Sequence, residues 1–212
     1  MVTQQHTNLV TCIDEHNTNY PVTMKHYFGK HSFNTFFAIG EISILNAKPL
    51  ALFSSVKCPG NIILKTFDLV RKLRDEGVIV ISGFHSPMEQ ESLDVLLRGD
   101  QPVIVCPARR LLNTHLPKKY NLPMQEGRLL LLSPFDARVK RVIKDAARIR
   151  NEFVAALADR VFVAYAAPGS KTEDLCKQIL NLDKPLLTFD VPENSALIAM
   201  GAMPFMHTAL NL

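Results

Sequence analysis

Small hydroxyl side chains, glycines and cations gather at the turns of this 212-residue chain. The clearest case is the turn Pro168-Gly169-Ser170-Lys171-Thr172, which follows a continuous apolar run. Free backbone N–H groups and hydroxyls at the start of a helix can bind the oxygens of an anion, and a lysine neutralises its charge. The chemistry that this turn favours is the binding of phosphate.

Three further turns, each after a predicted strand, carry residues of the same kinds, and an Arg-Asn pair lies within a predicted helix. The full set of candidate phosphate- or DNA-binding residues is Ser54, Ser55, Lys57, Ser82, Gly83, Arg109, Arg110, Arg150, Asn151, Gly169, Ser170, Lys171 and Thr172. Each turn taken alone is explained by the preference for Ser and Gly as helix caps. The set taken together favours a ligand that carries phosphate.

The segments that position these turns alternate between strand and helix. Strands are predicted at 49–54, 78–81, 102–106, 128–132, 161–167 and 185–189, and helices at 61–76, 87–97, 173–180 and 193–200. This rhythm predicts an α/β, Rossmann-like fold with a mostly parallel sheet of six or more strands and helices on both faces. Because ligands of such sheets bind beyond the carboxyl ends of the strands, we expect the turns to meet at one edge.

A long basic helix is predicted to start at Asp136, whose carboxylate is a candidate N-cap. Its apolar residues recur at helical spacing, and either Ser170 or Thr172 is expected to cap the helix after the next strand. The basic residues from Arg138 to Lys144 are read as a solvated face; they are Arg138, Lys140, Arg141 and Lys144.

The chain before the regular alternation is less patterned. Residues 1–19 are expected to be a loose lead-in, residues 20–48 an aromatic-rich lid or extension, and residues 107–125 an irregular basic segment. We therefore predict two parts, an N-terminal extension at 1–48 that packs on the core and a Rossmann-like domain at 49–212.

Composition and the absence of several motifs reduce the number of candidate functions. The apolar fraction of 47% is typical of a globular protein, and the net charge of +4 is compatible with a nucleic-acid or phosphate ligand. The four cysteines are widely spaced, and there is no membrane-length apolar run and no signal pattern, so a cytoplasmic location is expected. No zinc spacing, phosphate-loop motif or paired carboxylates stand out. We predict no catalytic residue, no metal and no cofactor, and a binding protein rather than an enzyme.

Five stretches, in order, resemble one family. They are NYPVTMKHYF, FFAIGEISILNAKPLALFSSVKCPG, EGVIVISGF, RIRNEFVAALADRVFVAYAAPGSKT and ENSALIAMGAMP. Together they resemble the Rossmann-like core of the DNA-processing protein DprA family, also called Smf, and we expect a divergent stand-alone member. The resemblance implies that four pieces of this chain correspond to the family's turn and helix motifs. They are Ser55, Ser82-Gly83, Arg150-Asn151 and Gly169-Ser170.

The resemblance implies a cytoplasmic homodimer that binds single-stranded DNA and passes it to the RecA recombinase during natural transformation. Two departures leave alternatives open. Ser54 and Val56 replace the family's turn glycine and arginine, with Lys57 as a substitute charge, and Pro87-Met88-Glu89 replaces Gly-Ile-Asp. The first alternative is a small nucleotide or nucleotide-sugar binding protein, either a sensor or a hydrolase, although the phosphoribohydrolase signature of the wider superfamily is absent. The second is a relative whose pocket has lost its ligand.

Overall fold

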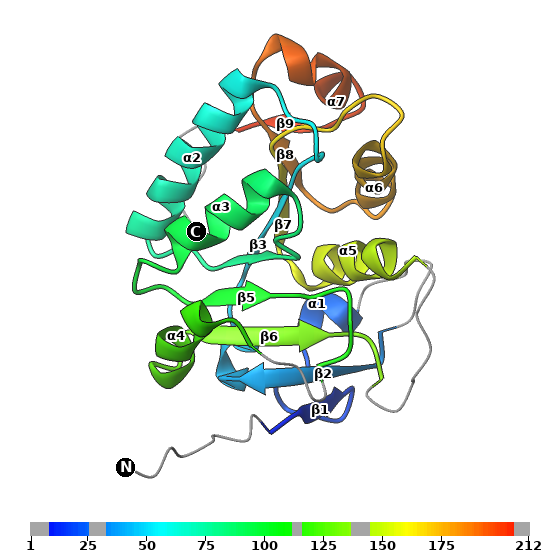
Figure 1. Ribbon diagram of the computed structural model, residues 1–212. Coiled ribbons are helices and arrows are strands. Elements are labelled where there is room, and N and C mark those ends of the chain that lie inside the picture. The colour runs from blue at the N-terminus through cyan, green and yellow to red at the C-terminus, as the bar shows by residue number, and fades with distance from the viewer. Residues whose placement is uncertain (1–8, 26–32, 112–115, 137–144, 206–212) are drawn as a thin grey trace.

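Nine strands form one sheet in the part of the chain that the computed structural model describes, which is residues 9–25, 33–111, 116–136 and 145–205 (Figure 1). Their order across the sheet is β1-β2-β6-β5-β4-β3-β7-β8-β9. Their bounds are β1 Thr11–Asp14, β2 Thr35–Gly40, β3 Leu50–Phe53, β4 Val80–Ser82, β5 Val103–Val105, β6 Leu129–Ser133, β7 Arg160–Val163, β8 Leu186–Thr188 and β9 Met203–Pro204. From β6 to β9 every neighbouring pair is parallel, whereas β1–β2 and β2–β6 are antiparallel. The α/β, Rossmann-like fold is thereby confirmed.

Helices cover both faces of this sheet (Figure 1). Their bounds are α1 Val22–Lys25, α2 Gly60–Asp75, α3 Pro87–Leu96, α4 Asn121–Gln125, α5 Ala146–Leu157, α6 Lys171–Leu180 and α7 Ser195–Ala199, with short 3₁₀ turns η1 Ile42–Asn46, η2 Lys118–Tyr120 and η3 Pro192–Asn194. Helices α2 and α3 lie on one face, and α5 and α6 lie on the other. None of the helices within the described ranges is long and apolar enough to span a membrane.

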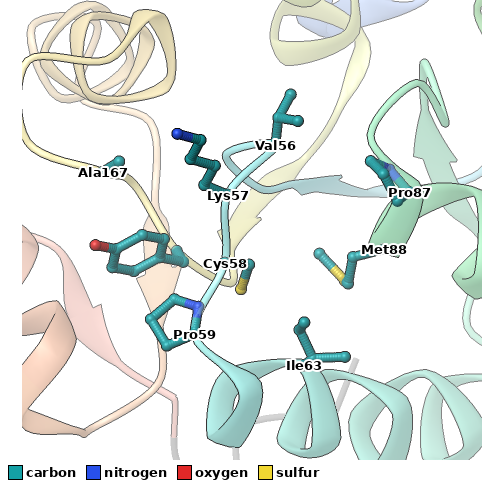
Figure 2. A pocket seen from close by; sticks show the side chains of 9 residues that line it. Val56, Lys57, Cys58, Pro59, Ile63, Pro87, Met88 and Ala167 are labelled. Carbon is teal, nitrogen blue, oxygen red and sulfur yellow. The ribbon is translucent and has the colours of Figure 1, made fainter.

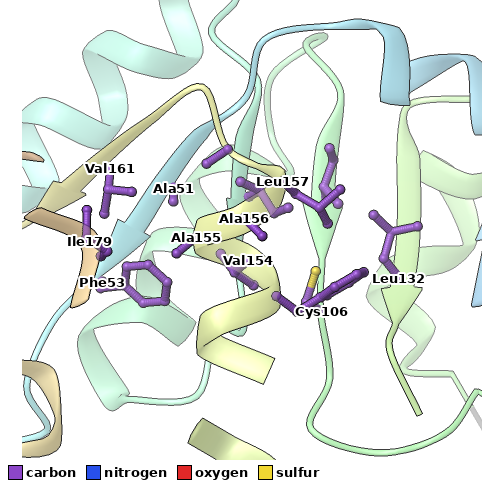
Figure 3. Close-up of a cluster of buried hydrophobic side chains, with 14 of the residues drawn as sticks. Ala51, Phe53, Cys106, Leu132, Val154, Ala155, Ala156, Leu157, Val161 and Ile179 are labelled. Atoms are coloured by element: carbon purple, nitrogen blue, oxygen red, sulfur yellow. The ribbon is translucent and has the colours of Figure 1, made fainter. Parts of the chain in front are cut away.

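The central strand β3 shows how the two faces are filled. Its successive side chains point to opposite faces, as the period of a strand requires. Leu50 and Leu52 enter the cluster beneath α2 and α3, whereas Ala51 and Phe53 enter the cluster beneath α5 and α6. Figure 3 shows the second cluster, in which Phe53 lies beside Ile179. A strand buried on both sides reads as a continuous apolar run, which is why the parallel strands were recognisable.

Three sequence expectations for the chain after residue 48 differ from the structure. The predicted strand 161–167 ends at Val163, because the backbone then turns toward the end of β3. Helix α5 begins at Ala146, and its N-cap position is Asp145 at φ 61°, so Asp136 does not cap it. The solvated basic face predicted before it lies outside the described residues; its members are Arg138, Lys140, Arg141 and Lys144. The segment 107–125, expected to be irregular, contains η2 and α4.

The N-terminal segment contributes to the sheet. Strand β1 lies within the stretch expected to be a loose lead-in, and β2 joins β1 to β6. Phe33 and Phe36 each pack edge-on against Phe153 of α5, with ring centroids 5.3 Å apart in both pairs. This segment therefore packs on the helix that carries Arg150, and a division of the chain at residue 48 stays a prediction.

Candidate functional site

The order of the strands creates a crevice next to β3. From β3 the chain runs through β4, β5 and β6 on one side, and α5 then carries it back to β7 on the other side of β3. The turns that follow β3 and β7 therefore lie side by side and lead to helices on opposite faces of the sheet, α2 after β3 and α6 after β7. Such a topological switch point, at the carboxyl ends of parallel strands, is where open α/β sheets bind ligands.

Ser55 ties these two turns together. Its Oγ accepts a hydrogen bond from the backbone N–H of Ala167 at 2.9 Å and lies 3.2 Å from Oγ of Ser170. Its own N–H donates to the carbonyl of Tyr165 at 2.9 Å. Ser55 is buried, so its hydroxyl fixes the geometry of the crevice from within.

Helix α6 begins at this junction. Ser170 is its N-cap, and its hydroxyl accepts from the N–H of Glu173 at 3.2 Å, which settles the cap in favour of Ser170 over Thr172. The N–H of Gly169, at φ 69°, donates to Glu173 Oε2 at 3.0 Å. That hydrogen bond, with help from Lys177, lowers the pKa of Glu173. The carboxylate of Glu173 thus supplies a negative charge from within the protein at the N-terminus of α6. Lys171 beside it is exposed, and Thr172 is half-buried.

A pocket of about 650 Å³ lies against the same junction (Figure 2). It is lined by Val56, Lys57, Cys58, Pro59, Ile63, Pro87, Met88, Tyr165 and Ala167. In Figure 2, Met88 of α3 and Ile63 of α2 project toward the segment that carries Cys58. Burial raises the pKa of the Cys58 thiol, so this group is neutral at physiological pH. Lys57 is the one basic residue among those that line the pocket.

Arg150 and Gly83 meet one strand further along, at the end of β4. Arg150 is only 4% exposed, and its guanidinium donates from Nη1 to the carbonyl of Cys106 at 3.2 Å and from Nε to Oδ1 of Asn151 at 2.7 Å. Burial lowers the pKa of this guanidinium, and the negative charge of Glu89 opposes that shift. Ser82 is fully buried, and its hydroxyl accepts from the N–H of Phe84 at 3.2 Å. Arg150 and Ser82 therefore lie beneath the surface rather than on it.

Glu89 connects this turn to the turn after β3, and sequence reasoning did not select it. One carboxylate oxygen accepts from the N–H of Ser54 at 3.0 Å, and the other accepts from the N–H groups of His85 and Ser86 at 2.9 and 3.2 Å. The signal that could have found it is the capping box Ser86-x-x-Glu89 at the start of α3. The box identifies a helix start, but nothing in it points to the bond with Ser54.

Arg109 and Arg110 belong to a different part of the edge. They follow β5, and the carbonyl of Arg109 accepts from the hydroxyl of Ser133 at the end of β6 at 2.8 Å. Strand β4 lies between β5 and β3, and neither arginine lines the pocket. The structure thus brings Ser54, Ser55, Lys57, Gly169 and Ser170 together, places Ser82, Gly83, Arg150 and Asn151 at the next turn, and leaves the two arginines further along.

These features define a Rossmann-like α/β protein with an open crevice at the switch point of its sheet. Among the described residues, no group of three His, Cys, Asp or Glu side chains is placed to hold a metal ion. The chain belongs to the family of DNA recombination-mediator protein A, whose model matches residues 11–207. The resemblance to DprA inferred from the sequence is therefore confirmed.

Two solved structures share the fold. The X-ray structure of DNA processing protein A (DprA) from Streptococcus pneumoniae is 17% identical, with a TM-score of 0.75 over 92% of this chain and 70% of that chain. DNA processing protein A from Helicobacter pylori, described for its single-stranded DNA binding mode, is 18% identical, with a TM-score of 0.73 over 93% of this chain and 91% of that chain. At these identities the likeness shows the fold alone. No curated protein sequence matches the chain.

Proposed function

We propose that this DNA-processing family member binds single-stranded DNA along the carboxyl edge of its sheet and acts as a binding protein rather than an enzyme. The observation that carries the proposal is the junction at Ser55, which joins the turns after β3 and β7 beside a pocket with exposed Lys57 and Lys171. The single-stranded DNA binding of the Helicobacter pylori protein supports it.

The candidate residues divide by exposure into two roles. Lys57, Gly169, Lys171 and Thr172 reach solvent and would contact phosphates, since cations and free backbone groups are the usual partners of phosphate oxygens. Exposed Arg109 and half-buried Arg110 would extend this path toward β5 and β6.

The remaining residues would position the turns that the strand touches. This role fits their burial or their internal hydrogen bonds. They are Ser54, Ser55, Ser82, Gly83, Arg150, Asn151 and Ser170. A cytoplasmic location, a homodimer and transfer of DNA to RecA during natural transformation complete the proposal, and they rest on the family resemblance.

The test is a fluorescence anisotropy titration with a labelled 20-nucleotide strand across a salt series. Affinity should fall steeply with salt, because each neutralised phosphate of a single strand contributes about 0.7 to the slope of log K against log salt. A Lys57→Ala/Lys171→Ala variant should bind more weakly and with a slope that is smaller by roughly 1 to 1.5.

A matched control removes two lysines from the opposite edge of the sheet. Lys48 precedes β3 and Lys72 lies near the C-terminal end of α2, so Lys48→Ala/Lys72→Ala has the same change in charge but should keep the wild-type slope. If the wild-type protein fails to bind the strand at low salt, the proposal is wrong. Equal losses in both double variants would show that net charge, rather than this edge, attracts DNA.

A second candidate function is the binding of a small nucleotide or nucleotide-sugar. One observation favours it: the pocket of about 650 Å³ falls within the range of roughly 300–1,000 Å³ that small-ligand sites occupy. A ligand that binds only the folded state raises the melting temperature, so a thermal-shift series with mononucleotides and nucleotide-sugars tests it. Saturable stabilisation with little dependence on salt would support this candidate over strand binding.

A further inference from the structure

A second pocket lies at the amino ends of the parallel strands, on the edge of the sheet opposite to the crevice. Its volume is about 480 Å³, and its lining comes from residues 18–23, residues 45–48, and residues 157 and 159 at the C-terminal end of α5. Lys48 precedes β3 and Asp159 precedes β7, whereas the turns of the crevice follow these strands. Small-ligand sites occupy roughly 300–1,000 Å³. This pocket is therefore a candidate site that is separate from the proposed function.

Hydrogen bonds within the protein hold the walls of the second pocket in place. The hydroxyl of Thr23 in α1 donates to the carbonyl of Leu157 at 3.1 Å, and α1 lies next to α5 (Figure 1). The hydroxyl of Tyr20 donates to the carbonyl of Phe33 at 3.3 Å. The N-terminal segment is thus fastened to the end of α5, and the pocket has fixed walls.

The pairing of β3 with β7 places a cation and an anion at the same pocket. Leu50 lies opposite Arg160 in the parallel register, and just before this pair the N–H of Asp159 donates to the carbonyl of Pro49 at 3.0 Å. Lys48 is the next residue back along the chain from Pro49, and both Lys48 and Asp159 line the pocket. Their backbone positions are therefore fixed relative to each other by the sheet.

Asp159 and Asn46 supply acceptors that the protein leaves largely unused. The carboxylate of Asp159 is half-buried, and its contact with Nε of Arg160 is long at 3.6 Å. Asn46 donates its amide N–H to Asn19 at 3.2 Å, and its side-chain oxygen has no partner among the residues that the structure describes. A carboxylate and an amide oxygen are the acceptors that an ammonium group needs.

Donors for an anion belong to the same lining. Lys48 is exposed, and in the described part of the chain neither Lys48 nor Thr18 makes a side-chain hydrogen bond or ion pair. Ammonium and hydroxyl groups bind carboxylate oxygens. Pro21, Leu45 and Ala47 add an apolar part to the lining. The pocket thus combines groups for a positive charge, a negative charge and a short apolar side chain.

We propose that the second pocket binds a free α-amino acid with an aliphatic side chain. The ammonium group of the ligand lies at Asp159, its carboxylate lies at Lys48, and its side chain packs against Leu45 and Ala47. A simple anion in this pocket meets the like charge of Asp159, and a simple amine meets that of Lys48. A molecule with both charges pairs each of them.

The test is a calorimetric titration of the whole chain with L-leucine and with two analogues of the same carbon skeleton. 4-Methylpentanoate lacks the amine, and 3-methylbutylamine lacks the carboxylate. We expect saturable binding of leucine with a Kd between about 10 μM and 1 mM. Each analogue should bind at least about tenfold more weakly, because one charged pair is lost.

Two charge variants assign the two ends of the ligand. Asp159→Asn should weaken leucine binding by about tenfold and leave 4-methylpentanoate unchanged or bound more tightly. Lys48→Met should weaken leucine binding by about tenfold and leave 3-methylbutylamine unchanged or bound more tightly. A general loss of structure weakens all three ligands alike, so this crossed pattern identifies the two pairs.

A third variant fills the pocket, and a fourth is the control. Ala47 has an extended backbone, with φ −84° and ψ 174°, that leucine adopts without strain. Ala47→Leu should therefore abolish leucine binding and keep the midpoint of urea unfolding. Lys65→Met removes an exposed lysine of α2 that lies outside the lining, and it should bind all three ligands like wild type.

Three results would overturn the proposal. The first is the absence of saturable leucine binding up to about 10 mM. The second is equal affinity for leucine and its two analogues, because the two charges then do not recognise the ligand. The third is leucine binding that Ala47→Leu leaves unchanged, since the amino acid then lies elsewhere. These titrations contain no DNA, so their failure leaves the proposed function untouched.

Discussion

Arg150 lies directly against the backbone of Gly83, so that a Cβ at residue 83 would overlap Nη1 and Cζ of the guanidinium. The glycine is required here by close approach and not by its φ angle, which is not positive. Because the guanidinium is buried and donates to the carbonyl of Cys106, it cannot move aside freely. The turn after β4 and helix α5 are therefore fitted to each other.

Replacing Gly83 by alanine should destabilise the protein. The added methyl forces Arg150 from its position, and overpacking of this kind costs about 1–3 kcal/mol in the free energy of unfolding. Urea unfolding measures the change. Gly60→Ala is the control: it lies at the start of α2 with no atom near its Cβ position, and it should leave stability unchanged or raise it by up to about 1 kcal/mol.

The two changes at this contact should also be coupled. In a Gly83→Ala/Arg150→Ala variant the methyl meets no guanidinium, so the loss of stability should be smaller than the sum of the single losses. Additive losses would mean that Gly83 and Arg150 act independently.

Replacing Glu89 by alanine should cost more than any other substitution in α3 that removes one charge. Its carboxylate accepts from the N–H groups of Ser54, His85 and Ser86, and each buried N–H that is left unpaired costs about 1–3 kcal/mol. We expect a loss of about 2–4 kcal/mol by chemical denaturation. Glu89→Gln, which keeps one acceptor oxygen, should fall between alanine and wild type.

Glu91 supplies the control on the same helix, because its side chain is exposed. Glu91→Ala should change stability by no more than about 0.5 kcal/mol. A comparable loss in the two alanine variants would contradict the role given to Glu89.

The hydroxyls of Ser55 and Ser170 should contribute to stability as a pair. Ser170→Ala removes an N-cap and should cost about 1 kcal/mol, and Ser55→Ala leaves the N–H of Ala167 unpaired at about 1–2 kcal/mol. A double-mutant cycle should give a coupling energy of at least about 0.5 kcal/mol. Ser43, at the opposite edge of the sheet, provides the comparison, and a Ser55→Ala/Ser43→Ala cycle should be additive.

Lys184 should make the free energy of unfolding depend on pH in the alkaline range. Its Nζ donates to the carbonyls of Ala155, Ala156 and Ala158 at the C-terminal end of α5, at 2.6, 3.0 and 2.6 Å. Burial lowers the pKa of this amine to about 8, with Asp159 opposing the shift. Between this value and the pKa of an unfolded-chain lysine, about 10.4, the unfolded state holds more protons than the folded state.

The free energy of unfolding should therefore gain a positive slope with pH above about 8 from this group, whereas below that pH the group contributes no slope. Urea unfolding of wild type and of Lys184→Met across pH 7.5–10 isolates it, because the methionine variant lacks the group. Lys48→Met, at an exposed position, should keep the wild-type slope. Parallel curves for wild type and Lys184→Met would show that Lys184 does not titrate in this window.

The parallel strands from β3 to β8 were predictable because burial on both faces makes them continuous apolar runs, as in β3 and β6. Strands β1 and β9 were not, because a four-residue edge strand with a single buried residue, Ile13, and a two-residue exposed strand carry no such signal. The predicted start of α5 at Asp136 was wrong, because Asp145 has a left-handed backbone and α5 begins only after it. The apolar periodicity runs on through this position, and no glycine or proline marks the break.

The candidate site also has features that could be predicted from the sequence and features that could not. That the turns after β3 and β7 meet follows from the parallel order of strands, and Ser55 and Ser170 were selected on that ground. The burial of Arg150 did not follow, since a charged residue in a basic segment is more often solvated. The apolar lining of the pocket was also missed, because nothing in the sequence singles out Ile63 and Met88 until the turn of residues 56–59 is placed beside them.

The contact between Ser55 and Ser170 joins positions 115 residues apart. The turn on one side of the crevice follows β3, the first parallel strand in the chain. The turn on the other side follows β7, which the chain reaches only after β4, β5, β6 and α5. A fragment that stops before α6 lacks one side of this crevice, however well its own strands pair. If the proposed function is correct, ligand binding should report whether the chain has folded as far as α6.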